Sequence, residues 1–236
     1  MISLSISIVI PVYNEEGYLL KTLGEIYEVL RKNFTDYEVI FVDDGSTDNS
    51  LKILVDISGQ FENIKVLCNN SNLGRAEALK KGFCATTKEV IFYIDADLPF
   101  DPSFVIRAIP FLSDNQMVIG NRDRWDNMFR KTCSLVYNLL IRRLFNLTIT
   151  DINVGAKVFK KNILDRIELR SRGSFIDAEF ILEAKKKGFS IKAIPCVYHK
   201  RVYGYSKMYD PVNIGRTICD MANYFLHRRS LLWQRN

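Results

Sequence analysis

Closely spaced cysteines are absent from this chain. Its five cysteines are odd in number and show no spacing typical of zinc ligands or of a disulfide framework. The cysteines are Cys68, Cys84, Cys133, Cys196 and Cys219. This pattern favours reduced thiols and a cytoplasmic protein.

Long apolar runs are absent as well. No segment reaches the roughly 18 uninterrupted apolar residues that a membrane-spanning helix needs. Residues 1–10 lead directly into a strand pattern, without the basic region and cleavage site of a signal peptide. We therefore expect a protein that is soluble or bound peripherally to a membrane.

Two common ligand-binding motifs are also missing. No glycine-rich turn follows the first apolar run, at residues 6–10, which argues against a dinucleotide-binding Rossmann site. No DNA- or RNA-binding module is recognisable, so we expect no nucleic-acid partner. The net charge of +6 and the isoelectric point of about 9.0 instead indicate another anionic partner, such as a nucleotide or a membrane surface.

Strand and helix patterns alternate through the first half of the chain. The expected strands are residues 6–10, 37–42, 64–67, 90–94 and 117–119. The expected helices are residues 17–32, a segment capped by Ser46 or Thr47 and ending near 58, and residues 75–85 and 102–112. This alternation predicts an α/β fold with a mostly parallel sheet covered by helices on both faces.

The pattern changes after Gly120. We expect a polar loop at 121–131, a helix at 132–147, a strand at 154–159 and a helix at 176–187 that ends at Gly188. A strand at 191–197, a basic loop at 200–208 and an amphipathic helix at 210–233 follow. The length of 236 residues suits one large domain, or one domain with a C-terminal extension.

Acidic and polar clusters follow three of the expected strands. They begin at Pro11, at Asp43 and at Asp95, and the last contains Asp95 and Asp97 at positions i and i+2. An extended backbone points two such carboxylates in the same direction. A parallel sheet brings the carboxyl ends of its strands to one edge, where ligands bind. Each cluster alone is explained by turns and helix caps, but their coincidence indicates a divalent metal with a phosphorylated ligand.

The same clusters resemble a known family. The carrying motifs are VIPVYNEE at 9–16, VDDGSTD at 42–48, NLG at 72–74 and DADL at 95–98. They resemble the family 2 glycosyltransferases, which have a GT-A fold. The resemblance implies an enzyme that uses a nucleotide sugar. The intact acids argue against the alternative of a non-catalytic nucleotide-binding or membrane-recruiting module.

Motifs in the second half narrow the resemblance. GNR at 120–122, DINVGAK at 151–157, DAE at 177–179 and RVYGYSK at 201–207 are similar to motifs of the dolichyl- and polyprenyl-phosphate mannosyl- and glucosyltransferases. This implies metal-dependent, inverting transfer of a hexose from a GDP-mannose or UDP-glucose type donor to a polyprenyl phosphate. A family 2 enzyme with a soluble or polysaccharide acceptor is the alternative.

The resemblance also implies which residues bind the donor and a Mg²⁺ or Mn²⁺ ion. Asp97 is the first metal ligand, and Asp95 contacts the metal or the ribose. The expected nucleotide-sugar residues are Pro11, Tyr13, Glu15, Asp43, Asp44, Asn72 and Asp95. The family often has glutamine where this chain has Pro99, so Asp101, water or substrate would complete the metal coordination.

The expected acceptor is a phosphate, which is ionised near neutral pH and needs no strong general base. The site should therefore be rich in cations and poor in histidine, and the chain contains only two histidines. Guanidinium and ammonium groups complement phosphate oxygens. The candidate phosphate-binding residues are Arg122, Arg130, Lys131, Ser134, Arg201 and Lys207. Asp97, Arg122 and Arg201 are the candidate catalytic residues.

We place the catalytic domain at 1–208, with a nucleotide-sugar half at 1–120 and an acceptor half at 121–208. The helix within 209–236 carries Ile214, Ile218, Met221 and Phe225 at helical spacing, with several arginines. It lies at the membrane interface, packs on the protein's own core, or contacts a dimer or membrane-protein partner. The helix at 135–147 is a second candidate for lipid contact, and we expect a location on the cytoplasmic face of a membrane.

Overall fold

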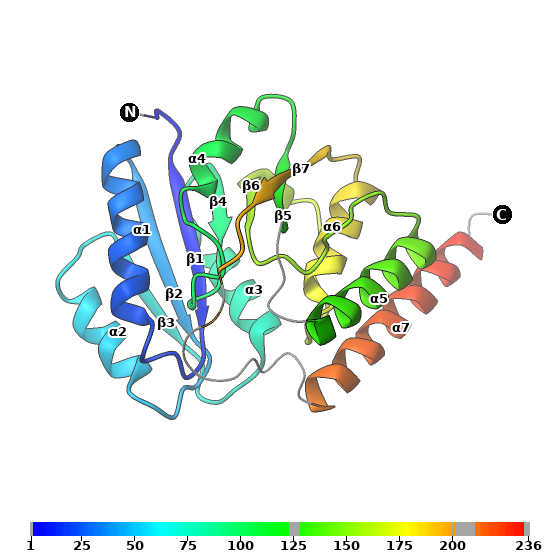
Figure 1. Ribbon diagram of the computed structural model, residues 1–236, viewed down its shortest axis with the longest axis horizontal. Helices are drawn as coiled ribbons and strands as arrows, with labels where there is room; N and C mark the ends of the chain where they lie inside the picture. Colours follow the sequence, from blue (N-terminus) through cyan, green and yellow to red (C-terminus); the bar gives the residue numbers. More distant parts are fainter. Residues whose placement is uncertain (1, 123–127, 200, 202–210, 234–236) are drawn as a thin grey trace.

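A seven-stranded sheet forms the centre of the structure (Figure 1). The computed structural model describes residues 2–122, 128–199, 201 and 211–233. The strands are β1 (Ile6–Val12), β2 (Tyr37–Asp43), β3 (Ile64–Cys68), β4 (Val90–Tyr93), β5 (Met117–Arg122), β6 (Lys157–Lys160) and β7 (Ile191–Cys196). Their order is β3-β2-β1-β4-β6-β5-β7, and β6 is antiparallel to both of its neighbours. The other pairs are parallel, which confirms the predicted fold class.

Helices cover both faces of this sheet. They are α1 (Leu19–Asn33), α2 (Ser50–Ser58), α3 (Arg75–Ala85), α4 (Phe104–Ala108), α5 (Met128–Phe145), α6 (Ile176–Lys186) and α7 (Pro211–Trp233). The chain moves outward from β1 to β3 and then crosses back to β4 on the other side of β1. Right-handed crossovers therefore place α1 and α2 on one face and α3 on the other (Figure 1).

Strand β4 is buried on both faces, as its uninterrupted apolar sequence predicts. Phe92 faces α4, where its ring lies 6.3 Å from that of Phe104. The next residue, Tyr93, faces α3, where its ring lies 5.8 Å from that of Phe83. Successive side chains of a strand point to opposite faces, so this strand end is held firmly between two helical layers.

The predicted cap of the second helix was wrong. Helix α2 begins at Ser50, and neither Ser46 nor Thr47 caps it. Ser46 Oγ instead accepts a hydrogen bond from the backbone N–H of Asn14 at 3.0 Å, and the N–H of Thr47 donates to Asn14 Oδ1 at 2.7 Å. These residues join the loops after β1 and β2, which the helix signal in the sequence did not indicate.

The helix expected at 102–112 is shorter and divided. Helix α4 covers only Phe104–Ala108, and a 3-10 helix continues over Ile109–Leu112. Pro110 lacks a backbone N–H and its ring obstructs an α-helical turn, which explains the change to the tighter helix.

The elements after Gly120 are also displaced from their predicted bounds. Helix α5 begins at Met128, so residues expected in a polar loop belong to its first turn. It ends at Phe145, before Asn146, whose φ of 54° lies in the left-handed region that asparagine tolerates. Strand β6 begins only at Lys157. Gly188, with a φ of 82°, follows α6 as predicted.

Helix α7 packs on the protein's own core through part of its predicted apolar stripe. Phe225 lies 6.1 Å from the ring of Phe145 on α5, and Met221 contacts the same core. Ile214 and Ile218, from the same stripe, remain 44% and 55% exposed. The second half of the stripe, Met221 and Phe225, therefore packs on the core, whereas its first half faces solvent. Within the described residues, no helix combines the length and apolarity needed to cross a bilayer.

Candidate active site

A cavity of about 270 Å³ opens at the carboxyl ends of β1 and β4. After β1 the chain continues toward one edge of the sheet, and after β4 it continues toward the other edge. Ligands bind at such a reversal of strand order in open α/β folds. Nine residues predicted from the sequence line the cavity: Pro11, Tyr13, Glu15, Asp44, Asn72, Asp95, Asp97, Arg122 and Arg201. Tertiary structure thus gathers residues from both halves of the chain into one site.

Three other predicted residues are described and lie outside this lining. Among the described side chains, Asp43, Lys131 and Ser134 are outside the cavity lining. Lys131 is exposed on the first turn of α5. The side chain of Arg130 and the whole of Lys207 lie outside the described part of the chain.

Asp44 organises the donor side of the cavity. Its carboxylate accepts hydrogen bonds from the backbone N–H groups of Leu73 (3.0 Å) and Gly74 (2.8 Å) and from Asn69 Nδ2 (2.8 Å). Gly74 has a φ of 100°, which favours glycine at this turn. Asp44 therefore fixes the NLG loop at the start of α3.

Its neighbour Asp43 is almost completely buried. One oxygen accepts a hydrogen bond from the N–H of Ser46 at 3.1 Å. Its Oδ1 atom has no hydrogen-bond partner among the described residues. The two adjacent acids therefore differ, since only Asp44 reaches the cavity wall.

The acidic pair, Asp95 and Asp97, lies in a turn after β4 and not in an extended strand. The backbone N–H of Leu98 donates to the carbonyl of Asp95 at 3.0 Å, and Leu98 has a φ of 45°. The prediction that strand alternation aligns the carboxylates was wrong about the backbone, because β4 ends at Tyr93. Asp95 and Asp97 nevertheless line the same cavity.

Arg201 joins both sides of the cavity. It donates from Nη1 to Asp97 Oδ2 at 3.0 Å and from Nη2 to Glu15 Oε2 at 2.6 Å. Its guanidinium lies 5.2 Å from the centre of the Tyr18 ring. This predicted phosphate-binding residue thus contacts the predicted metal ligand directly, although the two are far apart in sequence.

Pro99 helps to place Arg201. Its carbonyl accepts a hydrogen bond from the N–H of His199 at 2.8 Å, and Phe100 forms an antiparallel bridge with Tyr198. The residue that replaces the family's glutamine therefore anchors the Arg201 segment through its backbone. Asp101 is exposed outside the cavity lining, and its Oδ1 accepts a hydrogen bond from the backbone N–H of Ser103 at 2.7 Å. It is therefore not placed to complete a metal site.

The charge of Asp97 is affected by its surroundings. Burial raises the pKa of Asp97, the nearby negative charge of Asp95 raises it further, and Arg201 offsets only part of this effect. Among the described residues, no cluster of three or more acidic, histidine or cysteine side chains is placed to hold a metal. Asp95 and Asp97 are thus a two-carboxylate site whose charge a cation would stabilise.

An ionic network links the half-buried Asp95 to the buried side chains of Asp177 and Lys157. Arg75 donates to Asp95 Oδ1 at 2.9 Å and to Asp177 Oδ2 at 2.8 Å. Asp177 also accepts hydrogen bonds from Lys157 Nζ, at 2.5 Å, and from the hydroxyl of Tyr93. Burial alone would raise the pKa of Asp177, but Lys157 and Arg75 outweigh it, and the pKa lies below its usual value.

Arg122 is held by a second buried pair. It makes two hydrogen bonds of 2.6 Å to the carboxylate of Asp151, and its Nη2 reaches Ser134 Oγ at 3.5 Å. Arg122 lines the cavity, whereas Ser134 on α5 contacts Arg122 without lining the cavity itself. A bidentate pair of this kind fixes the plane of the guanidinium.

Several residues of the site were not assigned roles from the sequence. Arg75 and Tyr93 were missed altogether, and Asp151, Lys157 and Asp177 stood in motifs without a stated function. The available signal was position: Arg75 directly follows the NLG motif, and Tyr93 precedes the acidic pair by two residues. Their ionic partners come from distant segments, which sequence spacing does not reveal.

Comparison with known proteins identifies the family. Residues 7–168 match the model of glycosyl transferase family 2. Undecaprenyl-phosphate 4-deoxy-4-formamido-L-arabinose transferase from Photorhabdus laumondii is 32% identical over 175 residues, which cover 72% of this chain and 54% of that protein. The chain thus spans about half the length of this curated relative.

Solved structures share the fold. Glucosyl-3-phosphoglycerate synthase from Mycobacterium tuberculosis, in complex with Mn²⁺, UDP-glucose and phosphoglyceric acid, superposes with a TM-score of 0.72. The two chains are 19% identical, and the match covers 94% of this chain and 80% of the other. The same synthase with Mg²⁺ and UDP gives a TM-score of 0.66 at 17% identity, over 86% and 73% of the two chains. With the family match over more than half of its length, this chain belongs to glycosyltransferase family 2.

Proposed function

We propose that this protein transfers a sugar from a nucleotide sugar to a polyprenyl phosphate. The observation that carries the proposal is the gathering of Asp95, Asp97, Arg122 and Arg201 around one cavity. Acids suit a metal that binds a diphosphate, and arginines suit a phosphate acceptor. The curated relative from Photorhabdus laumondii, which acts on undecaprenyl phosphate, supports this choice of acceptor.

Asp95 and Asp97 are the residues that would hold Mg²⁺ or Mn²⁺. Their fit is supported by a shared cavity and by the raised pKa of Asp97, since a nearby cation favours the ionised carboxylate. Mg²⁺ is often bound by only one or two carboxylates, together with water and substrate phosphates. When bound, the ion would stabilise negative charge on the departing diphosphate.

The donor occupies the side of the cavity that β1 and the NLG loop form. Pro11, Tyr13 and Asn72 supply its wall, and Asp44 holds the loop in place. We expect a GDP-mannose or UDP-glucose type donor there. Glucosyl-3-phosphoglycerate synthase, which shares the fold, has been solved with UDP and Mn²⁺ or Mg²⁺, and this supports a nucleotide diphosphate donor.

The acceptor side requires cations more than a base. An acceptor phosphate is already ionised near pH 7, so Arg122 and Arg201 need only bind and orient it for attack on the sugar. Asp177, the buried acid of this side, is engaged by Lys157, Arg75 and the hydroxyl of Tyr93 and has a lowered pKa. These contacts make Asp177 a supporting anion, and attack opposite the leaving diphosphate would invert the anomeric carbon.

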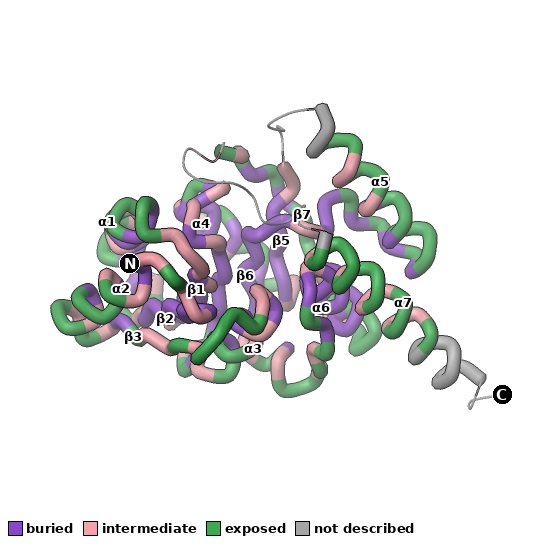
Figure 2. Tube along the Cα trace, turned by 90° about the horizontal axis from the view of Figure 1, so that it is seen from below, coloured by how far each residue is buried: buried purple, intermediate pink, exposed green. Residues whose placement is uncertain are grey.

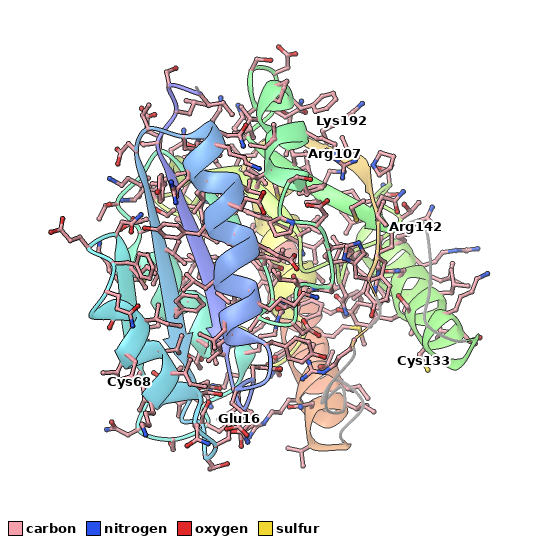
Figure 3. The ribbon with its side chains drawn as sticks, turned by 60° about the vertical axis from the view of Figure 1, so that its left-hand side comes forward. Glu16, Cys68, Arg107, Cys133, Arg142 and Lys192 are labelled. Atoms are coloured by element: carbon pink, nitrogen blue, oxygen red, sulfur yellow. The ribbon has the colours of Figure 1, made fainter. Side chains whose placement is uncertain are left out.

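A membrane surface is the proposed location of the reaction. Large apolar side chains of α5 are 41–55% exposed: Leu135, Val136, Leu139, Leu140 and Leu144. Arg142 and Arg143 on the same helix are exposed, and Arg142 points away from the body of the protein (Figure 3). Apolar side chains beside arginines suit an interface with anionic lipid headgroups. All five cysteines are free, which supports the cytoplasmic face.

Substitution of Asp97 tests the proposal. Asp97→Asn should reduce sugar transfer to polyprenyl phosphate by at least about 10²-fold, because it removes a charge that the site uses to bind the metal. Asp101→Asn is the matched control, since Asp101 is exposed outside the cavity and an asparagine also caps Ser103. The measurement is radiolabel transfer from a panel of nucleotide sugars, with and without Mn²⁺.

The acceptor is tested in the same assay. Transfer only to soluble acceptors would make the lipid-phosphate assignment wrong and favour the alternative family 2 activity. Equal transfer by Asp97→Asn and the unaltered protein would contradict the metal site itself.

A further inference from the structure

The loop before α6 forms one wall of the cavity. Arg172, Gly173 and Ser174 belong to the cavity lining. Two carboxylates hold four consecutive backbone N–H groups of this loop. Glu179 of α6 accepts from Arg170 and Ser171, each at 2.9 Å. The first half of the loop is therefore fixed by a residue of α6, within the part of the fold that precedes α7.

The second half of the loop is held from α7. Asp220 Oδ2 accepts hydrogen bonds from the N–H of Arg172 at 2.9 Å and from that of Gly173 at 2.7 Å. These two amides belong to cavity-lining residues, whereas Arg170 and Ser171 do not line the cavity. The part of the loop that faces a ligand thus depends on an acid from the C-terminal helix.

Other contacts place the same stretch of α7 against the cavity. Asn213 lines the cavity directly. A Cβ atom added to Gly173 would lie 3.2 Å from Arg216 Cβ and 3.2 Å from the backbone nitrogen of Thr217, so loop and helix touch closely. In Figure 1, α7 lies beside α5 at the same end of the molecule as α6.

We propose that Asp220 is a positioning residue for the active site and that α7 is part of the catalytic unit. Asp220 does not touch the reacting atoms in this proposal; it fixes Arg172 and Gly173, which then shape the cavity. The inference rests on the proposed function for its kinetic consequence. It also implies that the catalytic domain extends beyond residue 208, since its wall is incomplete without α7.

Asp220 would act by holding the loop at Arg172 and Gly173 in one conformation. A charged acceptor that takes two backbone N–H groups holds a loop more firmly than water does, because charge-assisted hydrogen bonds are the strong ones. Small displacements of a binding wall are costly to a transfer reaction that needs aligned groups. Loss of Asp220 should therefore free Arg172 and Gly173 while Glu179 still holds Arg170 and Ser171.

Backbone amide exchange, resolved by residue, tests the positioning without any substrate. In Asp220→Ala, the exchange rates of the Arg172 and Gly173 amides should rise by at least about tenfold. Those of Arg170 and Ser171 should change less than twofold. Asp220→Asn should restore most of the protection, because its carbonyl oxygen accepts hydrogen bonds at the same place.

Kinetics test the consequence for activity. Asp220→Ala should lower kcat/KM for sugar transfer by about tenfold or more, and Asp220→Asn should recover part of the loss. Tyr224→Phe is the control for docking of α7, since it removes the hydroxyl that donates the 2.8 Å hydrogen bond to Glu183 and keeps the ring packing. That variant should transfer sugar at the unaltered rate.

Three results would overturn the inference. These are unchanged exchange at Arg172 and Gly173, equal acceleration of all four amides, and equal kcat/KM for Asp220→Ala and Tyr224→Phe. A protein that transfers no sugar at all would instead contradict the proposed function, while the exchange pattern would still decide the role of Asp220.

Discussion

At the residue scale, Arg201 is the shared ion-pair partner of two acids in the candidate site. Its side chain is 18% exposed, and it forms ion pairs with Asp97 and Glu15, which are 16% and 14% exposed. Partly buried acids without a counter-charge are costly, and their pKa values rise. Arg201 therefore lowers the cost of the negative charge on Asp97, the proposed metal ligand, and also presents a guanidinium to the cavity.

Substitution of Arg201 should be severe. Arg201→Met keeps much of the volume but removes the charge, and we expect sugar transfer to fall by about 10²-fold or more. Arg107→Met is a suitable control, because Arg107 is exposed and donates a hydrogen bond to the carbonyl of Pro195, away from the cavity lining. Comparable activity of the two variants in the transfer assay would show that Arg201 is not part of the machinery.

Glu38 is a second buried acid, but it serves stability. It accepts hydrogen bonds from Ser7 (2.6 Å), from Lys65 (2.7 Å) and from the backbone N–H of Thr87 (2.7 Å). Burial would raise its pKa, but Lys65, Ser7 and Thr87 outweigh this and lower it to about 2. The folded-state pKa is depressed, so this contribution is complete above the ordinary value of 4.5 and is lost as the pH falls toward 2.

The effect of Glu38 can be measured by chemical denaturation. Glu38→Gln should reduce the free energy of unfolding at pH 7 by up to about 3 kcal/mol, as the pKa shift implies. The difference from the unaltered protein should shrink as the pH falls from 4.5 toward 2. Glu25→Gln, on an exposed helical ion pair with Lys21, should change stability by less than about 0.5 kcal/mol. A constant difference across this pH range would contradict the assignment.

At the scale of elements, the packing of α3 on the sheet depends on a glycine. A Cβ atom at Gly82 would lie 2.5 Å from Val9 Cγ1 of β1 and 3.1 Å from Val42 Cγ2 of β2. Valine side chains in strands are stiff and cannot move away easily. Close contact between α3 and strands β1 and β2 therefore requires a residue without a side chain at position 82, and α3 in turn begins with Arg75 at the cavity.

Two glycine substitutions separate packing from helix propensity. Gly82→Ala should destabilise the protein by about 1–2 kcal/mol, because overpacking outweighs the gain in propensity. Gly24→Ala, in the exposed face of α1 with open space around its Cβ, should stabilise it by about 0.5–1 kcal/mol. Thermal unfolding of both variants measures the difference. Stabilisation by both would show that α3 does not pack as closely as described.

At the scale of the whole molecule, α5 and α7 form an outer layer at one end. Phe145 of α5 lies 5.5 Å from the ring of Tyr224 on α7, and both helices have long exposed stretches (Figure 2). Their inner faces close the core, and their outer faces carry Leu139, Leu140 and Ile218 into solvent. Apolar exposure on this scale is typical of an interaction surface, and the proposed lipid acceptor would account for it.

Vesicle binding tests that surface. Leu139→Glu combined with Leu140→Glu should lower binding to vesicles with anionic lipid by at least about tenfold, since apolar area is lost and charge repulsion is added. Leu20→Glu combined with Val55→Glu is the control, because these residues lie on α1 and α2 and are at least as exposed as Leu139 and Leu140. An equal loss with both pairs would indicate general charge effects and contradict docking through α5.

The sequence by itself determined the fold class, the family and nine of the residues that line the cavity. Alternating patterns predict a sheet with helices on both faces, and strand-end motifs predict which residues meet at its edge, because both depend on local spacing and on one topological rule. The exact bounds of the elements could not be predicted in this way, as Pro110 and the hydrogen bond between Ser46 and Asn14 show. Element bounds changed where a proline or a contact between loops overrode the local pattern.

Only the tertiary structure decided which charges pair. Arg201 with Asp97, Arg75 with Asp177 and Asp220 with the loop at Arg172 each join segments far apart in the chain. Such pairs form because burial makes an unpaired charge or amide costly, and the fold selects the partner within reach. Spacing in the sequence cannot encode that choice. It depends on where β6, β7 and α7 return to the sheet edge.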